Sequence, residues 1–177
     1  MRISPVLIFI FCLKSLMFSQ QTFAVTENEL QKIIECKSDY DTYEEVWDNH
    51  KTILKKLGWT DTSDPDSITI YTYEHIKPIE IFNKSTQKIG ILGGGIVAYF
   101  PKEETQPLSQ LLNISNDPKL ESTQFFVGEK LINSQKETKY KITVHKKIIM
   151  IGLDDIAIGC NFQFDHDEVE KRARFEQ

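Results

Sequence analysis

The apolar residues near the start of the chain follow a helical pattern. Thr26 and Glu29 have the spacing of a capping box, in which two side chains bond the free N–H groups at a helix start. A short helix is therefore expected directly after Thr26, and Cys36 lies at its end. Its inward side would carry Leu30, Ile33 and Ile34.

A longer helix is predicted over about residues 39–57, with Ser38 or Asp39 as its N-cap. Its apolar and aromatic residues recur at helical steps, and they are Tyr40, Tyr43, Trp47, His50, Leu54 and Leu57. Acidic residues lie early and lysines late, which complements the helix dipole. Gly58 is the natural residue to follow its end.

Beyond a polar loop at Thr60–Asp66 the pattern changes to the alternation of β-strands. Pro78 should separate the first two strands, and a turn at Asn83–Thr86 should precede the third. The expected strands are Ile68–Glu74, Ile79–Phe82, Lys88–Leu92 and Ile96–Phe100.

The second half continues with one short helix and more strands. The helix is Thr105–Asn113, with Leu108, Leu111 and Leu112 inward. The strands are expected at Phe125–Ile132, residues 140–144, Ile148–Ile151 and residues 156–164, and Lys146-Lys147 either interrupts the middle pair or joins it. Cys160 lies on the apolar side of the last strand and should point into the core. Asp165–Gln177 is interpreted as a charged tail, with a frayed helix as the alternative.

Helices first and strands afterwards, with one intervening helix, is typical of an α+β domain with a mainly antiparallel sheet. With 177 residues, of which 40% are apolar and 27% charged, the chain can form one globular domain with a core. The expected architecture is two N-terminal helices packed on the sheet, in a single domain over residues 25–177.

The first 24 residues have the pattern of a secretory signal peptide. Val6–Leu13 is a short apolar run, and Thr22 and Ala24 are small residues suited to cleavage after Ala24. A membrane anchor is the alternative, but polar residues interrupt the run before it reaches about 20 residues. The chain remaining after cleavage is expected to be periplasmic or secreted, without stable membrane insertion.

Net charge narrows the class of partner. Loss of Arg2 and Lys14 reduces the basic residues from 21 to 19 against 26 acidic ones, a formal charge of −7. Such an acidic chain does not suggest a nucleic-acid partner. A basic ligand or basic protein surface is electrostatically easier to bind, although a solvated acidic surface is common.

Two cysteines, Cys36 and Cys160, remain after cleavage, and in an exported protein an even number favours a disulfide. Only one pairing is available, and the separated pair lacks the spacing of a zinc site. The bond would close a loop long enough for a chain-entropy stabilisation of about 4–5 kcal/mol.

Gly93, Gly94 and Gly95 form the most ambiguous stretch. Followed by Ile96-Val97-Ala98, they fit the G-x-G-x-x-A fingerprint of a dinucleotide site. That site needs a helix after the glycines, whereas the residues that follow are strand formers and Pro101 ends the run. The preferred interpretation is the tight turn of a hairpin, in which glycine adopts positive φ.

The histidines, His50, His75, His145 and His166, lack metal-ligand spacing. Asp165–Glu168 could chelate a cation and Asp154-Asp155 could act as a carboxylate pair, but a solvated tail and a turn are simpler interpretations. No catalytic, cofactor-binding or metal-binding residue is predicted.

Four aromatic residues could line a ligand groove, although residues in such patterns usually pack in the core. They are Tyr71, Tyr73, Tyr99 and Trp47. The sequence therefore does not locate a functional surface.

Several short motifs together resemble small, exported, largely uncharacterised proteobacterial proteins with one disulfide. The motifs are Glu35-Cys36, Leu57-Gly58-Trp59, Pro78-Ile79-Glu80-Ile81-Phe82, Gly94-Gly95-Ile96-Val97-Ala98 and Gly159-Cys160-Asn161-Phe162. Asn83 departs from the glycine that the pattern has after Phe82, so the turn there is expected to differ. The resemblance implies a fold and a compartment but no activity.

The functional hypothesis is a non-enzymatic, exported protein that binds another protein of the cell envelope. Its concrete version is an inhibitor or immunity protein against an envelope-targeting toxin or lytic enzyme. The alternative is an envelope hydrolase or small-ligand carrier with a groove near the glycine-rich hairpin. Small size, acidity and the disulfide motivate the first hypothesis.

Overall fold

A computed structural model describes residues 25–67, 70–118, 126–135, 141–152 and 154–175. The predicted signal peptide over residues 1–24 lies outside the described residues. Among the described helices, none combines the length and the apolar character needed to cross a membrane.

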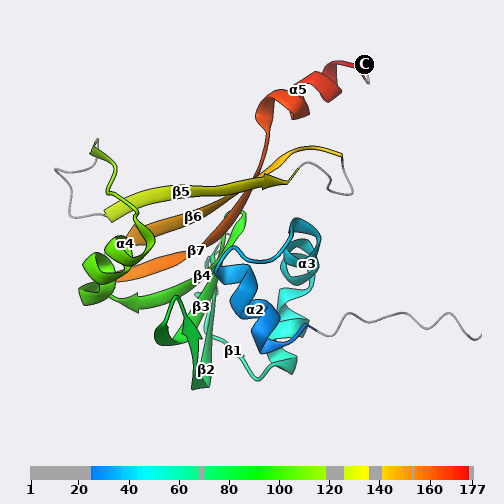
Figure 1. The fold of residues 1–177 in the computed structure, drawn as a ribbon. Helices are drawn as coiled ribbons and strands as arrows, with labels where there is room; N and C mark the ends of the chain where they lie inside the picture. The colour runs from blue at the N-terminus through cyan, green and yellow to red at the C-terminus, as the bar shows by residue number, and fades with distance from the viewer. Residues whose placement is uncertain (1–24, 68–69, 119–125, 136–140, 153, 176–177) are drawn as a thin grey trace, which may run out of the picture.

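The described chain forms helices on one antiparallel sheet of seven strands (Figure 1). The helices are α2 (Glu27–Ile34), α3 (Tyr40–Lys56), the 3-10 turn η1 (Lys102–Glu104), α4 (Thr105–Leu112) and α5 (His166–Phe175). The strands are β1 (Thr60–Asp61), β2 (Ile70–Ile81), β3 (Lys84–Leu92), β4 (Gly95–Pro101), β5 (Phe126–Gln135), β6 (Val144–Gly152) and β7 (Asp155–Phe164). Their order is β1-β2-β3-β4-β7-β6-β5, with every neighbouring pair antiparallel. The α+β prediction is confirmed.

Local signals place both N-terminal helices where the sequence predicts them. The Thr26 side chain accepts a hydrogen bond from the Glu29 N–H at 3.2 Å, and Asp39 caps α3 by accepting from the Thr42 N–H at 2.8 Å. At the end of α3, Gly58 has φ +88° and donates its N–H to the Lys55 carbonyl, while the Trp59 N–H donates to the Leu54 carbonyl. This pair of bonds is a Schellman motif, and it turns the chain sharply at Gly58.

The predicted interruption at Pro78 is wrong, because β2 runs through it and takes up an irregularity between Glu74 and Ile79 in its pairing with β3. At Lys146-Lys147 the structure has the continuous one of the two alternatives, because both residues pair with β7 within β6. The predicted loop at Thr60–Asp66 contains the short edge strand β1, which the sequence pattern missed.

The turn between β2 and β3 is shorter than predicted. Ile81 pairs with Lys84, so only Phe82 and Asn83 form the connection, and β3 already begins at Lys84. Phe82 has φ +51° and Asn83 has φ +60°. Positive φ at both central residues is the geometry of a type I′ hairpin turn, in which asparagine is one of the few side chains that fits easily.

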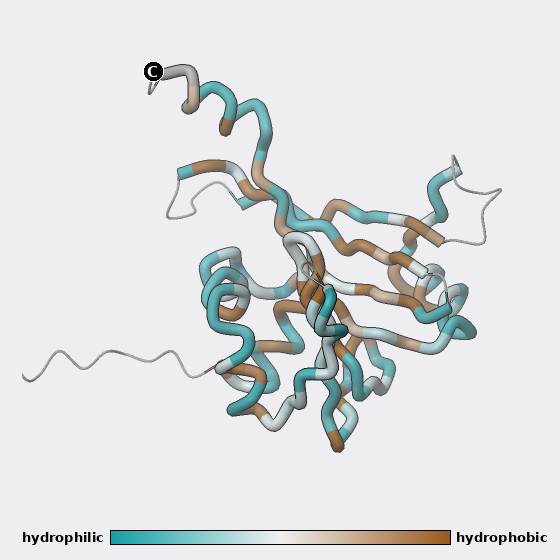
Figure 2. The backbone as a smooth tube through the Cα atoms, turned by 180° about the vertical axis from the view of Figure 1, so that it is seen from behind, coloured by the Kyte–Doolittle hydropathy of each residue, from teal (hydrophilic) through white to brown (hydrophobic). Residues whose placement is uncertain are grey.

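The helices and one face of the sheet enclose a single core. α2 contacts β2, β4 and β7, while α3 contacts β1. Buried residues of α2, α3 and α4 belong to one apolar cluster with alternate residues of the strands, such as Ile96 in β4 and Ile158 in β7. Leu108 of α4 is buried as predicted, but Leu111 is 52% exposed because it lies on the outer side of that short helix. Figure 2 shows apolar residues concentrated along the strands, whereas α5 is mainly hydrophilic.

Alternation along the strands places the remaining side chains on the opposite face of the sheet. In β7, Cys160 and Phe162 point toward the helices, so Ala157 and Asn161 belong to the other face. No described helix packs its buried residues against this second face. We call it the open face because no described helix covers it, although Val97 and Ala157 at its centre are only 0% and 7% exposed.

Candidate binding surface

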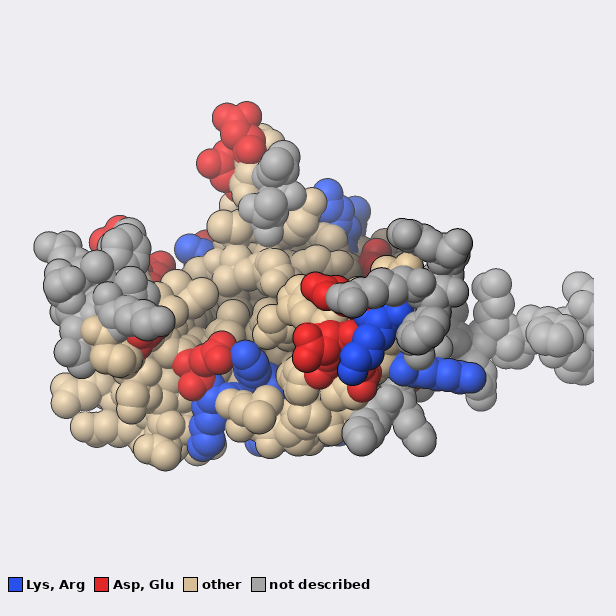
Figure 3. Space-filling model, turned by 90° about the horizontal axis from the view of Figure 1, so that it is seen from above, with Lys and Arg blue, Asp and Glu red and all other residues tan. Residues whose placement is uncertain are grey.

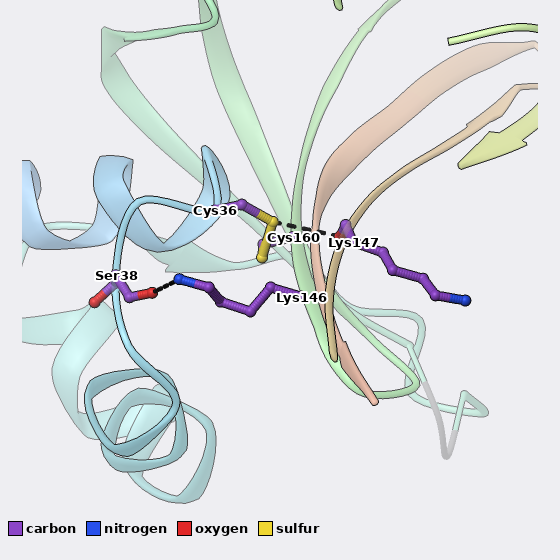
Figure 4. Close-up of a disulfide and its surroundings, with 5 residues drawn as sticks. All are labelled: Cys36, Ser38, Lys146, Lys147 and Cys160. Atoms are coloured by element: carbon purple, nitrogen blue, oxygen red, sulfur yellow. Dashed lines mark hydrogen bonds between the residues drawn. A yellow bond between two sulfur atoms is a disulfide. The ribbon is translucent and has the colours of Figure 1, made fainter. Parts of the chain in front are cut away.

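Cys36 and Cys160 form the predicted disulfide, with an S–S distance of 1.99 Å and a Cα–Cα distance of 4.9 Å. The bond joins the end of α2 to the centre of the sheet, because Cys160 pairs with Ile96 on one side and Ile148 on the other. Figure 4 shows the second tie beside it, in which the Lys146 ammonium donates to the Ser38 carbonyl at 2.8 Å. The connection between α2 and α3 is thus fixed to both β6 and β7.

Two buried charged groups belong to this connection. The Glu35 carboxylate accepts the Phe82 N–H at 2.8 Å, which ties the β2–β3 turn to the end of α2. Burial alone would raise the pKa of Glu35, but hydrogen bonds from Lys37, Phe82 and Gln31 lower it below its ordinary value. Lys146 is only 7% exposed, and burial lowers its pKa. Neither group is among the residues that line the hollows described below.

The glycine run forms the connection between β3 and β4. Leu92 pairs with Gly95, which leaves Gly93 and Gly94 as the two turn residues, and Gly94 has φ +97°. A Cβ atom on Gly95 would lie 2.6 Å from the Cys160 carbonyl oxygen, so glycine allows the close approach of β7. The next element is strand β4 and not a helix, so the phosphate-binding geometry of a dinucleotide site is not formed there.

The structure brings the glycine turn and the disulfide close together. The Phe162 N–H donates to the Gly94 carbonyl at 3.0 Å, two residues beyond Cys160. The Asn161 side chain also lies over the turn, at 3.4 Å from the Gly93 carbonyl. The glycine run and the cysteine pair, both noted in the sequence, therefore belong to the same part of the scaffold, where β4 pairs with β7.

The acidic and histidine candidates are spread over the fold. Asp165 caps α5 by accepting the Glu168 N–H at 3.1 Å and lies 3.3 Å from the His145 ring, while the Glu168 carboxylate accepts from Thr143. Those carboxylates therefore bond to the backbone and to neighbours rather than converge on a cation. Among the described residues, no group of three His, Cys, Asp or Glu side chains could hold a metal ion.

A hollow of about 670 Å³ lies where the β2–β3 hairpin bends away from β4, and its charged groups face one another. The Lys88 ammonium is 3.9 Å from the Asp155 carboxylate and 5.0 Å from the centre of the Tyr99 ring. Burial raises the pKa of Tyr99, and the Asp155 charge adds to the effect. The ring covers Gly90, whose added Cβ would lie 2.7 Å from it, so Tyr99 fills space in the sheet.

The open face of the sheet is apolar at its β5–β6 end. Leu131 and Ile132 of β5 are 58% and 39% exposed, and Ile151 of β6 is 41% exposed. Val127 and Ile149 beside them are half-buried. We call these five residues the β5–β6 patch. Seen from above, with α5 nearest the viewer, charged side chains gather in separate groups with uncharged surface between them (Figure 3).

The patch adjoins the free edge of the sheet. Val127 donates its N–H to the Asn116 side chain at 2.9 Å and accepts from the Asp117 N–H at 2.7 Å, so its backbone faces away from β6. In an antiparallel pair the direction alternates, so the backbone groups of Glu129 and Leu131 also face outward. No described residue pairs with them there. Within the described part of the chain, Asn116 and Asp117 thus cover the first position of this edge, and no residue pairs with the following two.

Sequence reasoning placed strands near these residues but did not identify the patch. The available signal was the run Ile148–Ile151, because apolar residues at every position of a strand indicate that both faces are apolar. The consecutive Leu131 and Ile132 were a second signal. Successive side chains of a strand point to opposite faces, so two adjacent apolar residues cannot both follow a pattern with one apolar face.

Comparison with known proteins leaves this surface to be interpreted from its own geometry. No family model, no curated protein and no solved structure matches the chain.

Proposed function

We propose that this chain is an exported, non-enzymatic protein that binds another protein of the cell envelope through the β5–β6 patch. The observation that carries the proposal is the group of exposed apolar side chains, Leu131, Ile132 and Ile151, at the open end of the sheet. Glu129 and Lys147 lie among these side chains on the same face and form an ion pair at 3.0 Å, so the surface mixes apolar and polar groups, as protein–protein interaction sites commonly do. The disulfide supports export, because such bonds persist in oxidising compartments.

The free β5 edge supports a specific mode of binding. The outward backbone groups of Glu129 and Leu131 could pair with an extended strand of the partner, and the patch would then contact its side chains. Asn116 and Asp117 already occupy the neighbouring position of the same edge with two strand-like hydrogen bonds. A partner strand would continue that pairing along β5.

A second copy of the chain fits this edge less well. A two-fold antiparallel pairing centred on Glu129 or Lys130 places like charges directly opposite each other, which is destabilising. A two-fold pairing of two β5 strands centred beyond Lys130 would include the irregularity between Leu131 and Asn133. Bulges of this kind discourage pairing between the edge strands of two sheets. The preferred occupant is therefore a strand of a different protein.

Site-specific photocross-linking tests the proposal. A benzophenone amino acid at Leu131 should cross-link to a defined protein in an envelope fraction of the source organism. The same group at Glu80, an exposed residue at the far end of the sheet, should not. The purified partner should then bind the Leu131→Ser/Ile151→Ser variant about tenfold more weakly or worse, which is the loss expected from about 1.4 kcal/mol.

The inhibitor or immunity version adds a second readout. If the partner is a toxin or lytic enzyme, the wild-type chain should inhibit it and the patch variant should not. Equal cross-linking from positions 131 and 80, or unchanged affinity of the patch variant, would contradict the proposed surface.

A further inference from the structure

A second hollow, of about 530 Å³, lies between the C-terminal end of α3 and strands β1 and β2. Lys51 and Lys55 of α3 line one side, and Asp61 of β1 lines its edge. Trp59 and Tyr73 line its inner part and are only 3% and 2% exposed. We call this space the α3–β1 hollow. It lies at the end of the sheet opposite the β5–β6 patch.

Two of the residues that line the hollow, Trp59 and Tyr73, carry buried polar atoms without hydrogen-bond partners among the described residues. The indole Nε1 of Trp59 and the hydroxyl of Tyr73 are buried and have no hydrogen-bond partner among the described residues. The Nε2 atom of His50 is a third such atom, and its ring lies 6.1 Å from the Tyr73 ring. Buried polar groups are nearly always hydrogen-bonded, so three unsatisfied atoms in one region call for a ligand or ordered solvent.

The backbone holds Trp59 at this place. The Schellman motif at Gly58 reverses the chain, and the Trp59 N–H bonds to the Leu54 carbonyl at 2.9 Å. The indole then packs against the His75 ring at 5.2 Å. These contacts fix the direction of the side chain before any ligand binds, so its N–H group is preorganised.

The chemistry of the wall selects an acceptor with negative charge. An indole N–H can only donate a hydrogen bond. Burial raises the pKa of Tyr73 to about 12, so its hydroxyl is protonated and able to donate at neutral pH. The Lys51 and Lys55 ammonium groups add two positive charges.

One carboxylate opposes an anion here. Asp61 lies at the edge of the hollow, but its oxygen already accepts from the Ser63 N–H and hydroxyl. Those hydrogen bonds lower the pKa of Asp61, so it remains ionised, and two ammonium groups outweigh its single charge. The carbonyls of Leu54 and Lys55, in the last turn of α3, accept bonds from Trp59 and Gly58.

We propose that the α3–β1 hollow binds a small organic molecule through a carboxylate or phosphate group. The Trp59 indole and Tyr73 hydroxyl would donate to the oxyanion, and Lys51 and Lys55 would neutralise its charge. A volume of about 530 Å³ exceeds that of a bare ion and is in the range of sites for small molecules. The aromatic walls of Trp59 and Tyr73 suit an apolar body attached to the anionic group.

An NMR titration of the full chain tests this site. The indole N–H signals of Trp47 and Trp59 are followed while sodium benzoate or sodium phosphate is added at pH 7, with sodium chloride as the control for ionic strength. The Trp59 signal should shift and saturate, and the Trp47 signal should stay in place. Additions to about 20 mM detect a dissociation constant of about 1 mM. The two arms distinguish a carboxylate from a phosphate preference.

Matched variants separate a built site from a general effect of charge. Lys55→Gln should weaken binding about tenfold, since a hydrogen bond or contact with a charged group contributes about that factor. Lys56→Gln changes the neighbouring lysine, which does not line the hollow, and should leave binding unchanged. Tyr73→Phe should also weaken binding while it keeps the buried ring.

Three results would overturn the inference. The first is a Trp59 signal that neither anion moves beyond the effect of chloride. The second is equal weakening by Lys55→Gln and Lys56→Gln, which indicates charge screening alone. The third is unchanged affinity for the anion in both single variants, Tyr73→Phe and Lys55→Gln. None of these results bears on the β5–β6 patch, so the proposed function is tested separately.

Discussion

Asn83 shows at the residue scale how a single side chain fits an unusual backbone position. With φ +60° it lies in the left-handed region, where most residues are strained. Asn83→Ala should therefore lower the free energy of unfolding by about 1 kcal/mol, whereas Asn83→Gly should leave it unchanged or slightly raised. Urea unfolding of the two variants measures the difference. Equal midpoints for alanine and glycine would show that the backbone conformation is not the cause.

Lys146 leads to a prediction about pH. Burial lowers its pKa in the folded state, and the smaller effect of Asp39 does not compensate. Between that lowered value and the ordinary 10.5, the unfolded chain binds more protons, so stability should rise with pH. Below both values the penalty is constant.

The matched comparison is with Lys146→Met, which fills the same space without a charge. The difference in free energy of unfolding between wild type and Lys146→Met should shift in favour of wild type as pH rises from neutral toward 10.5. Urea titrations at several pH values measure it. Parallel curves for the two proteins would exclude a penalty from the buried ammonium group.

At the scale of the element, the sequence predicted those features that depend on neighbouring residues. The caps at Thr26 and Asp39 and the glycine at the end of α3 form through local hydrogen bonds, so their spacing was sufficient. Pro78 misled the interpretation, because the pairing of β2 with β3 outweighs its local preference, and the pairing of β6 with β7 decided between the two alternatives at Lys146-Lys147. Strand β1 escaped notice because its pairing with β2 is not local.

The β5 edge leads to a prediction about strand direction. The Glu129 N–H should face outward and the Lys130 N–H should face β6. Glu129→Pro removes a donor that the sheet does not use, so it should cost about 1 kcal/mol or less. Lys130→Pro removes a ladder bond and should cost about 3 kcal/mol or more. Urea unfolding compares them, and Glu129→Gln controls for the loss of the exposed Lys147 pair. The reverse order of the two proline variants would contradict the assigned edge.

At the scale of the whole molecule, the sequence predicted the scaffold better than the surfaces. Cys36 and Cys160 could be paired by counting, and that bond fixes the helices on the sheet. The β5–β6 patch and the α3–β1 hollow depend on which residues the fold leaves uncovered or unsatisfied, such as Leu131 and Trp59. Exposure of this kind arises from contacts distant in the sequence, so no local pattern reveals it.

The disulfide should account for a large part of the stability of the whole domain. It closes a separation of 124 residues, for which the chain-entropy model gives about 4–5 kcal/mol. A domain of this size is stable by about 5–15 kcal/mol, so the Cys36→Ala/Cys160→Ala variant should lose between about a third and nearly all of its free energy of unfolding. The other ties of the same connection, from Glu35 to Phe82 and from Lys146 to Ser38, should keep some of its native structure.

Urea unfolding with and without a reducing agent measures this contribution. The wild-type chain should lose stability on reduction and approach the double alanine variant, which should not respond to the reductant. Thiol labelling of the denatured, unreduced protein should find neither Cys36 nor Cys160 reactive. If reduction releases both thiols and the midpoint stays unchanged, the ordering of the α2–α3 connection must come from packing and from its buried polar contacts instead of the covalent bond.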